Sequence, residues 1–357
     1  MSETNELTAR LGIELPIVQA PMAGASGVAL AIAVARAGGL GSLPAAMVTS
    51  EQLSEQIDEF RLATQSPLNL NFFCHVPPDV SREQLDAWSR SLSRFDAEFG
   101  VDRARSPSGS PRHPFDDDAC RLVERCHPEL VSFHFGLPAP ELVDRVRATG
   151  AVVISSATTV AEAVWLERHG CDIVIAQGAE AGGHRGMFLT TDVAAQPGTM
   201  ALVPRVVDAV DVPVIAAGGI ADGRGVAAAF VLGASAVQIG TAYLLCPEAL
   251  ISPIHRRALT GGSIDDTVLT NVFTGRPARG RRNRLVDELG PISADAPAFP
   301  TANNAVAPLR AAAEQAGSVD FSPLWSGQAG APTTDVPAGQ LTRELIDGAR
   351  EVLATFA

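Results

Sequence analysis

Short apolar segments alternate along most of the chain with longer amphipathic ones. The short segments are rich in Val, Ile and Ala, as is typical of parallel strands covered by helices. They predict eight strands, over residues 17–20, 40–44, 68–73, 130–136, 152–156, 172–177, 214–217 and 236–240. Apolar residues at helical spacing predict helices between them, over 28–37, 50–64, 118–126, 140–149, 160–169, 201–209 and 223–232. Eight repeats with polar strand ends favour an α/β fold of the (β/α)8 TIM barrel type over a doubly wound sheet.

The segment L-V-S-F-H-F-G, at the fourth predicted strand, carries a polar group where a barrel enzyme needs one. Side chains along a strand alternate between its two faces. Val131, Phe133 and Phe135 therefore share one face, which we expect to meet the helices. Ser132 and His134 share the other face. Because barrel active sites lie at the C-terminal ends of the strands, His134 is predicted to point into the barrel mouth.

Two segments interrupt the regular pattern. Residues 76–117 are polar and charged, with one amphipathic helix expected over 81–99 and an Arg-, Ser-, Pro- and Gly-rich stretch over 103–114. The pattern weakens again after residue 247, with a helix expected over 251–260 and short helices such as 306–316, before a closing helix over 340–356. Loops that follow barrel strands tolerate insertions, so we expect the two segments to meet as a lid. The predicted organisation is a barrel over 1–78 and 118–260, a lid or substrate domain over 79–117 and 261–335, and a C-terminal helix over 336–357.

Composition narrows the possible chemistry. The chain has 357 residues, a formal net charge of −13 and no lysine, so all 27 basic residues are arginine. The acidic balance argues against nucleic-acid and anionic-membrane partners. The lack of lysine excludes Schiff-base enzymes and P-loop nucleotide sites. Five scattered cysteines, a polar N-terminus and the lack of a long apolar run predict a reduced, cytoplasmic protein without a membrane partner.

Two glycine-rich turns follow the last two predicted strands. They read A-A-G-G-I-A-D-G, which contains Gly218 and Gly219, and Q-I-G-T over residues 238–241. Barrels often bind phosphate at this place, because backbone N–H groups converge there and glycine lets the backbone approach the oxygens. Thr241 adds a hydroxyl, and a backbone cradle of this kind needs no lysine. The alternative is a pair of ordinary βα turns.

Other polar side chains also stand at predicted strand ends. The loop Q-G-A-E-A-G-G-H-R-G begins with the amide of Gln177 and contains two ionisable groups, Glu180 and His184. Asn71 and Gln238 are further amides on inward faces. Burying an amide without a partner is costly, so several in one barrel mouth indicate a polar heterocyclic ligand. The alternatives are amides that bond one another or water, and a loop with ordinary turn glycines.

A lone histidine on a strand has a second interpretation, since a buried imidazole can simply bond a backbone carbonyl. His134 has no second histidine at a metal-binding spacing, so we expect no metal. The sequence also lacks the G-x-S-x-G elbow of serine hydrolases and a G-x-G-x-x-G motif after a strand. An isoalloxazine ring, with its row of carbonyl and nitrogen atoms, would satisfy the amides of the mouth.

Taken together, the motifs resemble those of the nitronate monooxygenases, formerly called 2-nitropropane dioxygenases, and of their class I members in particular. The resemblance spans residues 12–330 and rests on Q-A-P-M-A-G, S-F-H-F-G, Q-G-x-E-A-G-G-H, A-A-G-G-I and Q-I-G-T, in this order. It implies an FMN-binding (β/α)8 barrel in which His134 is the catalytic residue. The residues implied to contact FMN are Met22, Asn71, Gln177, Gly182, Gly218, Gly219, Gln238, Ile239, Gly240 and Thr241.

The resemblance also implies a reaction. Family members oxidise alkyl nitronates, such as propionate 3-nitronate, with O2 to a carbonyl compound and nitrite through a flavin semiquinone. A protonated His134 would bind the nitronate oxygens, whereas a neutral one would take the α-proton of a nitroalkane. The single tyrosine, Tyr243, departs from relatives that line the substrate pocket with several aromatic residues, which leaves the substrate's size open. The expected partners are the nitronate and O2, and the expected assembly is a monomer or homodimer.

Three other functions stay open. Flavin-dependent NAD(P)H reductases of quinones or enoyl-acyl-carrier-protein resemble the chain in the G-G-H loop, where His184 would be the key histidine, but the S-F-H-F-G strand favours the monooxygenase. A flavin-binding barrel without turnover would not need an inward imidazole. A phosphosugar isomerase or aldolase could use the same phosphate turns, but an acid–base version would need an inward Glu or Asp at a strand end, and the pattern offers none.

Overall fold

The computed structural model describes residues 6–103, 112–261, 266–331 and 335–356. Eight strands pair in parallel in the order β1-β9-β8-β6-β5-β4-β3-β2. The hydrogen bonds from Leu40 N to Ile17 O (2.8 Å) and from Gln19 N to Leu40 O (2.9 Å) join the two ends of this order. The sheet is therefore a barrel, as the alternation predicts. Its strands are β1 (Ile17–Gln19), β2 (Gly41–Pro44), β3 (Leu68–Phe73), β4 (Leu130–His134), β5 (Val152–Ala157), β6 (Ile173–Gln177), β8 (Val214–Ala217) and β9 (Ala236–Ile239).

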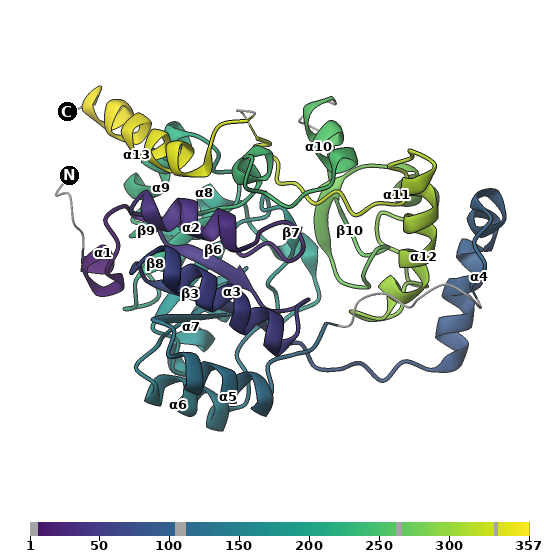
Figure 1. Ribbon diagram of the computed structural model, residues 1–357, viewed down its shortest axis with the longest axis horizontal. Helices are drawn as coiled ribbons and strands as arrows, with labels where there is room; N and C mark the ends of the chain where they lie inside the picture. Colours follow the sequence, from purple (N-terminus) through teal and green to yellow (C-terminus); the bar gives the residue numbers. More distant parts are fainter. Residues whose placement is uncertain (1–5, 104–111, 262–265, 332–334, 357) are drawn as a thin grey trace.

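Helices surround the barrel on the left of Figure 1. They are α2 (Val28–Arg36), α3 (Ser50–Ala63), α5 (Asp117–Cys126), α6 (Pro140–Ala148), α7 (Val160–Arg168), α8 (Thr199–Val207) and α9 (Gly223–Val231). The C-terminal helix α13 (Ala338–Ala354) packs against α9 and α2. It thus occupies the position of the helix that follows the eighth barrel strand, although most of the lid lies between that strand and α13 in the sequence.

The barrel interior is apolar at the N-terminal ends of the strands and becomes polar towards their C-terminal ends. Leu7 and Leu11 of the short helix α1 (Glu6–Leu11) pack with inward residues of the strands and close that end. The next layer is polar, because Gln19 Oε1 accepts from Ser42 N (2.9 Å) and Asn69 Nδ2 donates to Ser42 Oγ (3.0 Å). Polarity therefore increases towards the C-terminal ends of the strands, where a ligand would bind.

A second unit lies beside the barrel mouth, on the right of Figure 1. It has its own core, in which Trp88, Phe95, Phe273 and Phe321 are almost fully buried. Trp88 Nε1 also donates to Ala302 O (3.2 Å). The unit contains α4 (Arg82–Phe99), β10 (Thr267–Thr270), β11 (Ala278–Arg281), α11 (Arg284–Leu289) and α12 (Ala302–Gln315), and α10 (Pro253–Thr260) leads into it. The two inserted segments meet here because α4 packs on α12, and we refer to this unit as the lid.

Two details differ from the sequence-based expectation. The stretch after β6 is not only a loop, because it contains the two-residue strand β7 (Gly183–His184), which pairs with β11, and the 3₁₀ helix η1 (Val193–Ala195). Phe135 does not join Phe133 on the helix-facing side, since β4 ends at His134 and Phe135 has a φ of 75°. That left-handed residue breaks the alternation and turns the Phe135 ring against Phe73 and Phe299. Most of the Arg-rich stretch over 103–114 lies outside the described residues.

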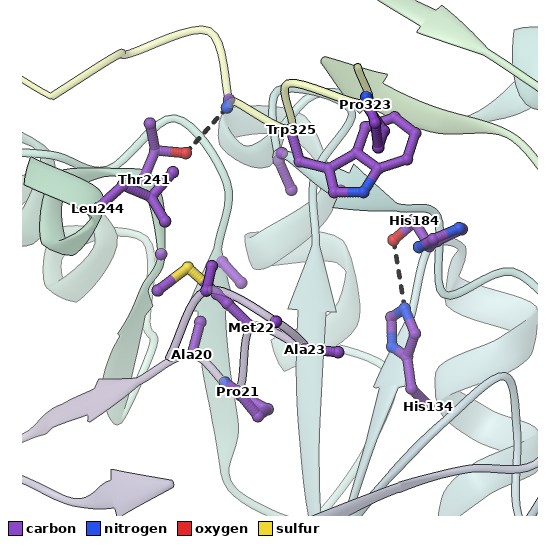
Figure 2. Close-up of a pocket in the computed structure, with 18 of the residues that line it drawn as sticks. Ala20, Pro21, Met22, Ala23, His134, His184, Thr241, Leu244, Pro323 and Trp325 are labelled. Carbon is purple, nitrogen blue, oxygen red and sulfur yellow. Dashed lines mark hydrogen bonds between the residues drawn. The ribbon is translucent and has the colours of Figure 1, made fainter. Parts of the chain in front are cut away.

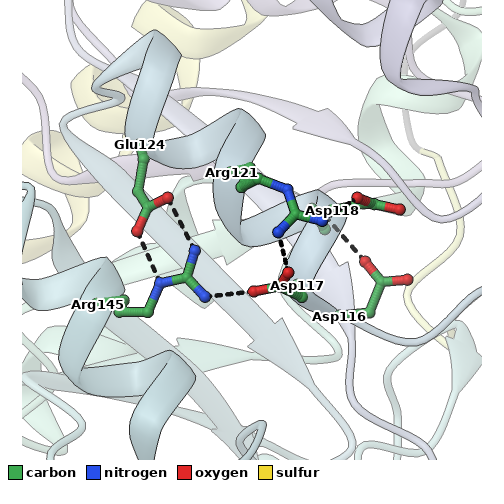
Figure 3. A network of polar contacts seen from close by, with 7 residues as sticks. Asp116, Asp117, Asp118, Arg121, Glu124 and Arg145 are labelled. Atoms are coloured by element: carbon green, nitrogen blue, oxygen red, sulfur yellow. Dashed lines mark hydrogen bonds and ion pairs between the residues drawn. The ribbon is translucent and has the colours of Figure 1, made fainter.

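An ion-pair network joins two barrel helices at the surface (Figure 3). Arg145 of α6 binds Glu124 of α5 through two hydrogen bonds, of 2.7 and 2.9 Å. Arg145 also reaches Asp117 at the start of α5, which Arg121 of the same helix contacts as well. These contacts lower the pKa values of Glu124 and Asp117.

Candidate active site

A cavity of about 500 Å³ opens at the C-terminal ends of the barrel strands, under the lid. Its wall includes eleven of the residues selected from the sequence, namely Met22, Asn71, His134, Gln177, Gly182, His184, Gly218, Gly219, Gln238, Gly240 and Thr241. Figure 2 shows Thr241 and His134 on opposite sides of this cavity, with Met22 between them. Residues from far apart in the sequence are thus brought to one site, in the place where barrels carry their chemistry.

The predicted phosphate turns lie at the Thr241 end. Gly218 and Gly219 have φ values of +108° and +70°, a region that side chains other than glycine rarely adopt. Thr241 follows β9, at the start of the 3₁₀ helix η2 (Thr241–Leu245), and its hydroxyl accepts a hydrogen bond from Gly327 N (2.9 Å). The lid connection is therefore tied to the turn after the last barrel strand. Ile239 lies differently, because its fully buried side chain packs in the core between the sheet and the helices.

The predicted amide side chains differ in how many hydrogen bonds they form with other residues of the protein. Asn71 Nδ2 donates to Ser132 Oγ (3.0 Å) on the neighbouring strand, and Gln238 faces the cavity from β9. Gln177 uses both amide atoms on its own loop. Its Nε2 donates to His184 O (3.1 Å) and its Oε1 accepts from Gly186 N (2.8 Å). Gln177 therefore fixes the loop that carries His184, in addition to lining the cavity.

Met22 and Gly182, which are also predicted to contact FMN, lie in turns whose backbone is held closely by neighbouring residues. Met22 N donates to Ser26 Oγ (2.9 Å), so the turn after β1 is held by its own hydrogen bonds. A Cβ atom on Gly182 would lie 2.5 Å from Gly327 N, so only glycine fits between the loop and the lid connection. Glu180 does not line the cavity, because its carboxylate accepts hydrogen bonds from Thr199 N and Oγ1 at the start of α8.

His134 sits at the other end of the cavity with both ring nitrogens engaged. Its Nδ1 lies 2.6 Å from Ser156 Oγ, and its Nε2 lies 3.2 Å from His184 O. Burial lowers the pKa of His134 to about 3, and the positive charge of Arg276 adds to the shift. The imidazole is therefore neutral at ordinary pH.

His184 shares this wall. Its Nε2 lies 2.9 Å from Thr274 Oγ1, and burial, followed by the charge of Arg112, holds its pKa well below the usual value. The ring packs against Phe299 (5.2 Å between centroids) and Trp325 (5.4 Å). The structure thus brings together the two histidines on which the rival functions depend.

Sequence reasoning missed several residues of the cavity wall. Ser156 at the end of β5 could have been found by the same rule as His134, since it is a polar group at a strand end. Arg112, Arg310 and Trp325 also line the cavity, but they come from the inserted segments, where no periodic pattern indicates which side chains point inward. Arg276 lies behind the wall, 3.9 Å from the Phe135 ring, and donates to Met187 O.

The described part of the chain contains no cluster of His, Cys, Asp and Glu side chains that could hold a metal ion. Within the same residues, every helix is too short or too polar to span a membrane.

Known proteins resemble this chain along nearly its whole length. The family model described as nitronate monooxygenase matches residues 4–348. A nitronate monooxygenase of Pseudomonas aeruginosa is 42% identical over 350 residues, which cover 97% of this chain and 99% of that protein. The structure of a nitroalkane oxidase from Streptomyces ansochromogenes matches with a TM-score of 0.88 and 38% identity, over 99% of this chain and 100% of that chain. FabK from Thermotoga maritima matches with a TM-score of 0.72 and 27% identity, over 99% and 98% of the two chains.

Proposed function

The chain belongs to the nitronate monooxygenase family and is an oxidoreductase, and on that premise we propose that it uses FMN and O2 to oxidise short alkyl nitronates to carbonyl compounds and nitrite. The observation that carries this proposal is the position of His134 opposite Thr241 in one cavity. A phosphate site and a reactive site on opposite sides of one cavity suit a ligand such as FMN, with the substrate beside its ring.

The cavity wall fits FMN by the chemistry of its donors. Gly219 and Thr241 supply a backbone turn and a hydroxyl for the phosphate, a site type that needs no lysine. Asn71 and Gln238 supply amides, which can both donate to and accept from the edge of a heterocycle. Bound FMN would supply the acceptor for the substrate's electrons and pass them on to O2.

The neutral state of His134 supports a nitronate, rather than a nitroalkane, as the substrate. A general base works best when its pKa lies near the operating pH. With a pKa of about 3, His134 is a weak base for removing the α-proton of a nitroalkane. A nitronate arrives already deprotonated, so its oxidation does not require His134 to act as a base.

An aromatic cluster beside the two histidines supports the same function. Phe73, Phe135 and Phe299 pack together with centroid distances of 4.9 to 6.0 Å, beside His134 and His184. In a site with little water, hydrogen bonds to a small anion are stronger than at the surface. A short alkyl chain would lie against Phe73, the member of this cluster that lines the cavity.

The first test is turnover of the purified, FMN-loaded protein with a pre-ionised nitronate and with the matching neutral nitroalkane. We expect O2 consumption and nitrite release with the nitronate and much slower rates with the nitroalkane. NADH serves as the parallel reductant under anaerobic conditions. Rapid bleaching of the flavin by NADH, with the nitronate inert, would instead support a reductase that relies on His184. A cytoplasmic location and a monomer or homodimer stay predictions from the sequence, as does the division into barrel and lid.

A further inference from the structure

The turn between β10 and β11 in the lid binds the loop that follows β6 of the barrel. Within this turn, Arg276 donates from Nε to Arg185 O (3.5 Å) and from Nη2 to Met187 O. The neighbouring Pro277 O accepts a hydrogen bond from Arg185 N (2.9 Å). The lid therefore holds the main chain of the loop on both sides of Gly186.

The held segment lies directly against the ring of His134. A Cβ atom on Gly186 would lie 3.0 Å from His134 Cε1 and 2.6 Å from Ser156 Oγ, so the main chain has no room to move closer. Two residues earlier, His184 O lies 3.2 Å from His134 Nε2. The main chain over 184–186 thus forms one side of the space that the imidazole occupies.

Arg276 also reaches His134 from a second side, through an aromatic ring. Its guanidinium carbon lies 3.9 Å from the centre of the Phe135 ring. The centre of the Phe135 ring lies in turn 4.4 Å from that of the His134 ring. A cation is attracted to the face of an aromatic ring, and more strongly where water is excluded. Arg276 therefore fixes Phe135 against the imidazole while its hydrogen bonds fix the loop.

The guanidinium keeps a positive charge in this position. Burial lowers the pKa of Arg276 to about 10, so it stays charged at neutral pH. Its two hydrogen bonds described above go to neutral carbonyl oxygens. Glu162 of α7 partly offsets the charge, and the carboxylate of Glu162 is held by Phe188 N (2.6 Å) and Leu189 N (3.1 Å) of the same loop.

The other groups around the two histidines add positive charge or none. Burial keeps the rings of His75 and His184 neutral by lowering their pKa values. A proton on His134 would therefore face only like charges from these elements, which disfavours the charged ring. The titratable and charged groups concerned are His75 after β3, Arg112 of the inserted segment, His184 and Arg185 of the loop after β6, and Arg276 before β11.

We propose that Arg276 is a positioning residue for His134, because it holds both the loop segment 185–187 and the Phe135 ring against the imidazole. Its charge then favours an imidazole that offers a hydrogen bond over one that has taken up a proton. This inference rests on the proposed function, in which His134 meets the substrate, and it adds a lid residue that is not among the described residues of the cavity wall. Arg276 acts through its neighbours and not by contact with the substrate.

The first test follows the ring nitrogens of His134 by NMR in the FMN-loaded protein, with His134→Ala to identify the signals. In the parent protein we expect one tautomer, with the proton on Nε2, and no protonation between about pH 5 and about pH 8. Arg276→Gln should shift both nitrogen signals towards the average of the two tautomers and should raise the pKa of His134. Unchanged signals and an unchanged titration in Arg276→Gln would overturn the proposal.

A second variant separates the charge of Arg276 from its geometry. Arg276→Lys keeps the positive charge but replaces the planar fork by a single ammonium group, which does not reproduce both carbonyl contacts. We expect its His134 ring to stay neutral, as in the parent protein, and its nitrogen signals to lie between those of the parent protein and Arg276→Gln. Thermal unfolding and flavin content identify a variant that fails to fold, and Arg276→Lys provides the comparison if Arg276→Gln does so.

Arg256→Gln is the matched control. Arg256 of α10 also donates to two main-chain carbonyls, Leu245 O (2.7 Å) and Cys246 O (3.0 Å), and it is not among the described residues of the cavity wall. Its loss should lower the melting temperature but leave the His134 signals unchanged. Equal changes of the His134 signals in Arg256→Gln and Arg276→Gln would overturn the proposal, since a loosened lid would then explain both.

The kinetic test compares the variants with a pre-ionised nitronate. We expect Arg276→Gln to lower kcat by about 10- to 100-fold, the range for a misplaced catalytic group, with a smaller change in KM. If nitronate turns over but neither kcat nor the His134 signals depend on Arg276, the positioning role fails and the proposed function stands. If no nitronate is turned over but the His134 signals still depend on Arg276, the proposed function fails and the positioning role stands.

Discussion

The Nε2 atom of His134 lies 3.2 Å from the backbone carbonyl oxygen of His184. A carbonyl oxygen can only accept, so Nε2 carries the proton of the neutral ring, and Nδ1 accepts from the Ser156 hydroxyl at 2.6 Å. One tautomer is therefore fixed by two neighbours. The position of His134 depends on the loop that Gln177 holds in place, because the same carbonyl also accepts from Gln177 Nε2.

The first prediction concerns the pH dependence of turnover. Because burial lowers the pKa of His134 to about 3, the ring does not change charge near its usual value of 6.5. We expect kcat/KM for a nitronate to show no step near pH 6.5 that arises from His134. His134→Ala should lower kcat/KM by about 10²- to 10³-fold, the range for loss of a polar group that stabilises the reacting anion, with flavin content and thermal unfolding as checks of the fold. A step near pH 6.5 that disappears in His134→Ala would contradict this assignment.

The second prediction concerns acid stability. Burial lowers the pKa of His75 from 6.5 to about 4, so the unfolded chain binds a proton that the folded chain excludes. The neutral ring therefore contributes stability above pH 6.5, and this contribution is lost as the pH falls from 6.5 towards 4. His75→Phe should flatten the fall in the free energy of unfolding over this range by about 1.4 kcal/mol per pH unit, the value for one proton.

Urea unfolding at a series of pH values measures this slope. His169→Gln is the control, because the His169 ring is exposed, where it stacks on Trp165 and places Nδ1 2.7 Å from Trp165 O. It should leave the slope of the parent protein unchanged. An unchanged slope in His75→Phe would mean that His75 does not take part in acid unfolding.

The third prediction separates backbone strain from loss of the flavin site. Gly219 and Gly150 both have positive φ values, of +70° and +89°. An alanine at either place costs about 1–2 kcal/mol of stability, but only Gly219 lines the cavity. We expect Gly219→Ala to lower both the melting temperature and the affinity for FMN, whereas Gly150→Ala lowers the melting temperature alone. FMN fluorescence titration and thermal unfolding measure the two effects, and equal FMN affinities would remove Gly219 from the site.

The fourth prediction concerns the contact between Thr241 and the lid. Thr241→Val keeps the shape of the side chain but leaves Gly327 N without its acceptor, which lies at 2.9 Å in the parent protein. An unsatisfied N–H costs about 1–3 kcal/mol. We expect faster hydrogen exchange at Gly327 and weaker FMN binding in Thr241→Val, and near-normal values in Thr241→Ser. If Thr241→Ser behaves like Thr241→Val, the hydroxyl is not the group that matters.

The fifth prediction concerns the network in Figure 3. Arg145→Gln removes the hydrogen bonds to Glu124 and Asp117, whose pKa values Arg145 lowers. Surface pairs contribute little individually and are screened by salt, so we expect a small drop in melting temperature that shrinks as salt is added. The difference from the parent protein should also shrink as the pH falls and the carboxylates take up protons. Arg125→Gln on the same helix is the control, since Arg125 forms no ion pair with the rest of the described chain.

The fold could be predicted from the sequence because barrel strands and helices repeat one local pattern. The strand β3, for example, has the predicted bounds, and Leu70 and Asn71 lie on its predicted faces. The positions of β10 and β11 could not be predicted, because these strands are four residues long and carry Arg and Thr in place of an apolar alternation. Their pairing is decided by contacts with the distant strand β7 rather than by local sequence.

The same contrast holds for the candidate site. Polar residues at strand ends, such as Asn71 and His134, could be placed because the end of a barrel strand fixes where a side chain points. Arg112 could not, because it lies in the inserted segment, before the chain rejoins the barrel at the hydrogen bond from Phe115 N to Phe73 O (2.7 Å). Ile239 was selected with its motif, although the alternation of β9 turns its side chain into the core.

The pairing of β7 with β11 has a mechanical consequence. β7 belongs to the loop after a barrel strand, and β11 belongs to the lid, so main-chain hydrogen bonds cross from one to the other at His184 and Ala278. A movement of the lid large enough to release product must carry this loop along or break those bonds. The lid and the carbonyl oxygen next to His134 Nε2 are therefore linked through main-chain hydrogen bonds, so a displacement of β11 that preserved them would also displace the hydrogen-bond acceptor of His134.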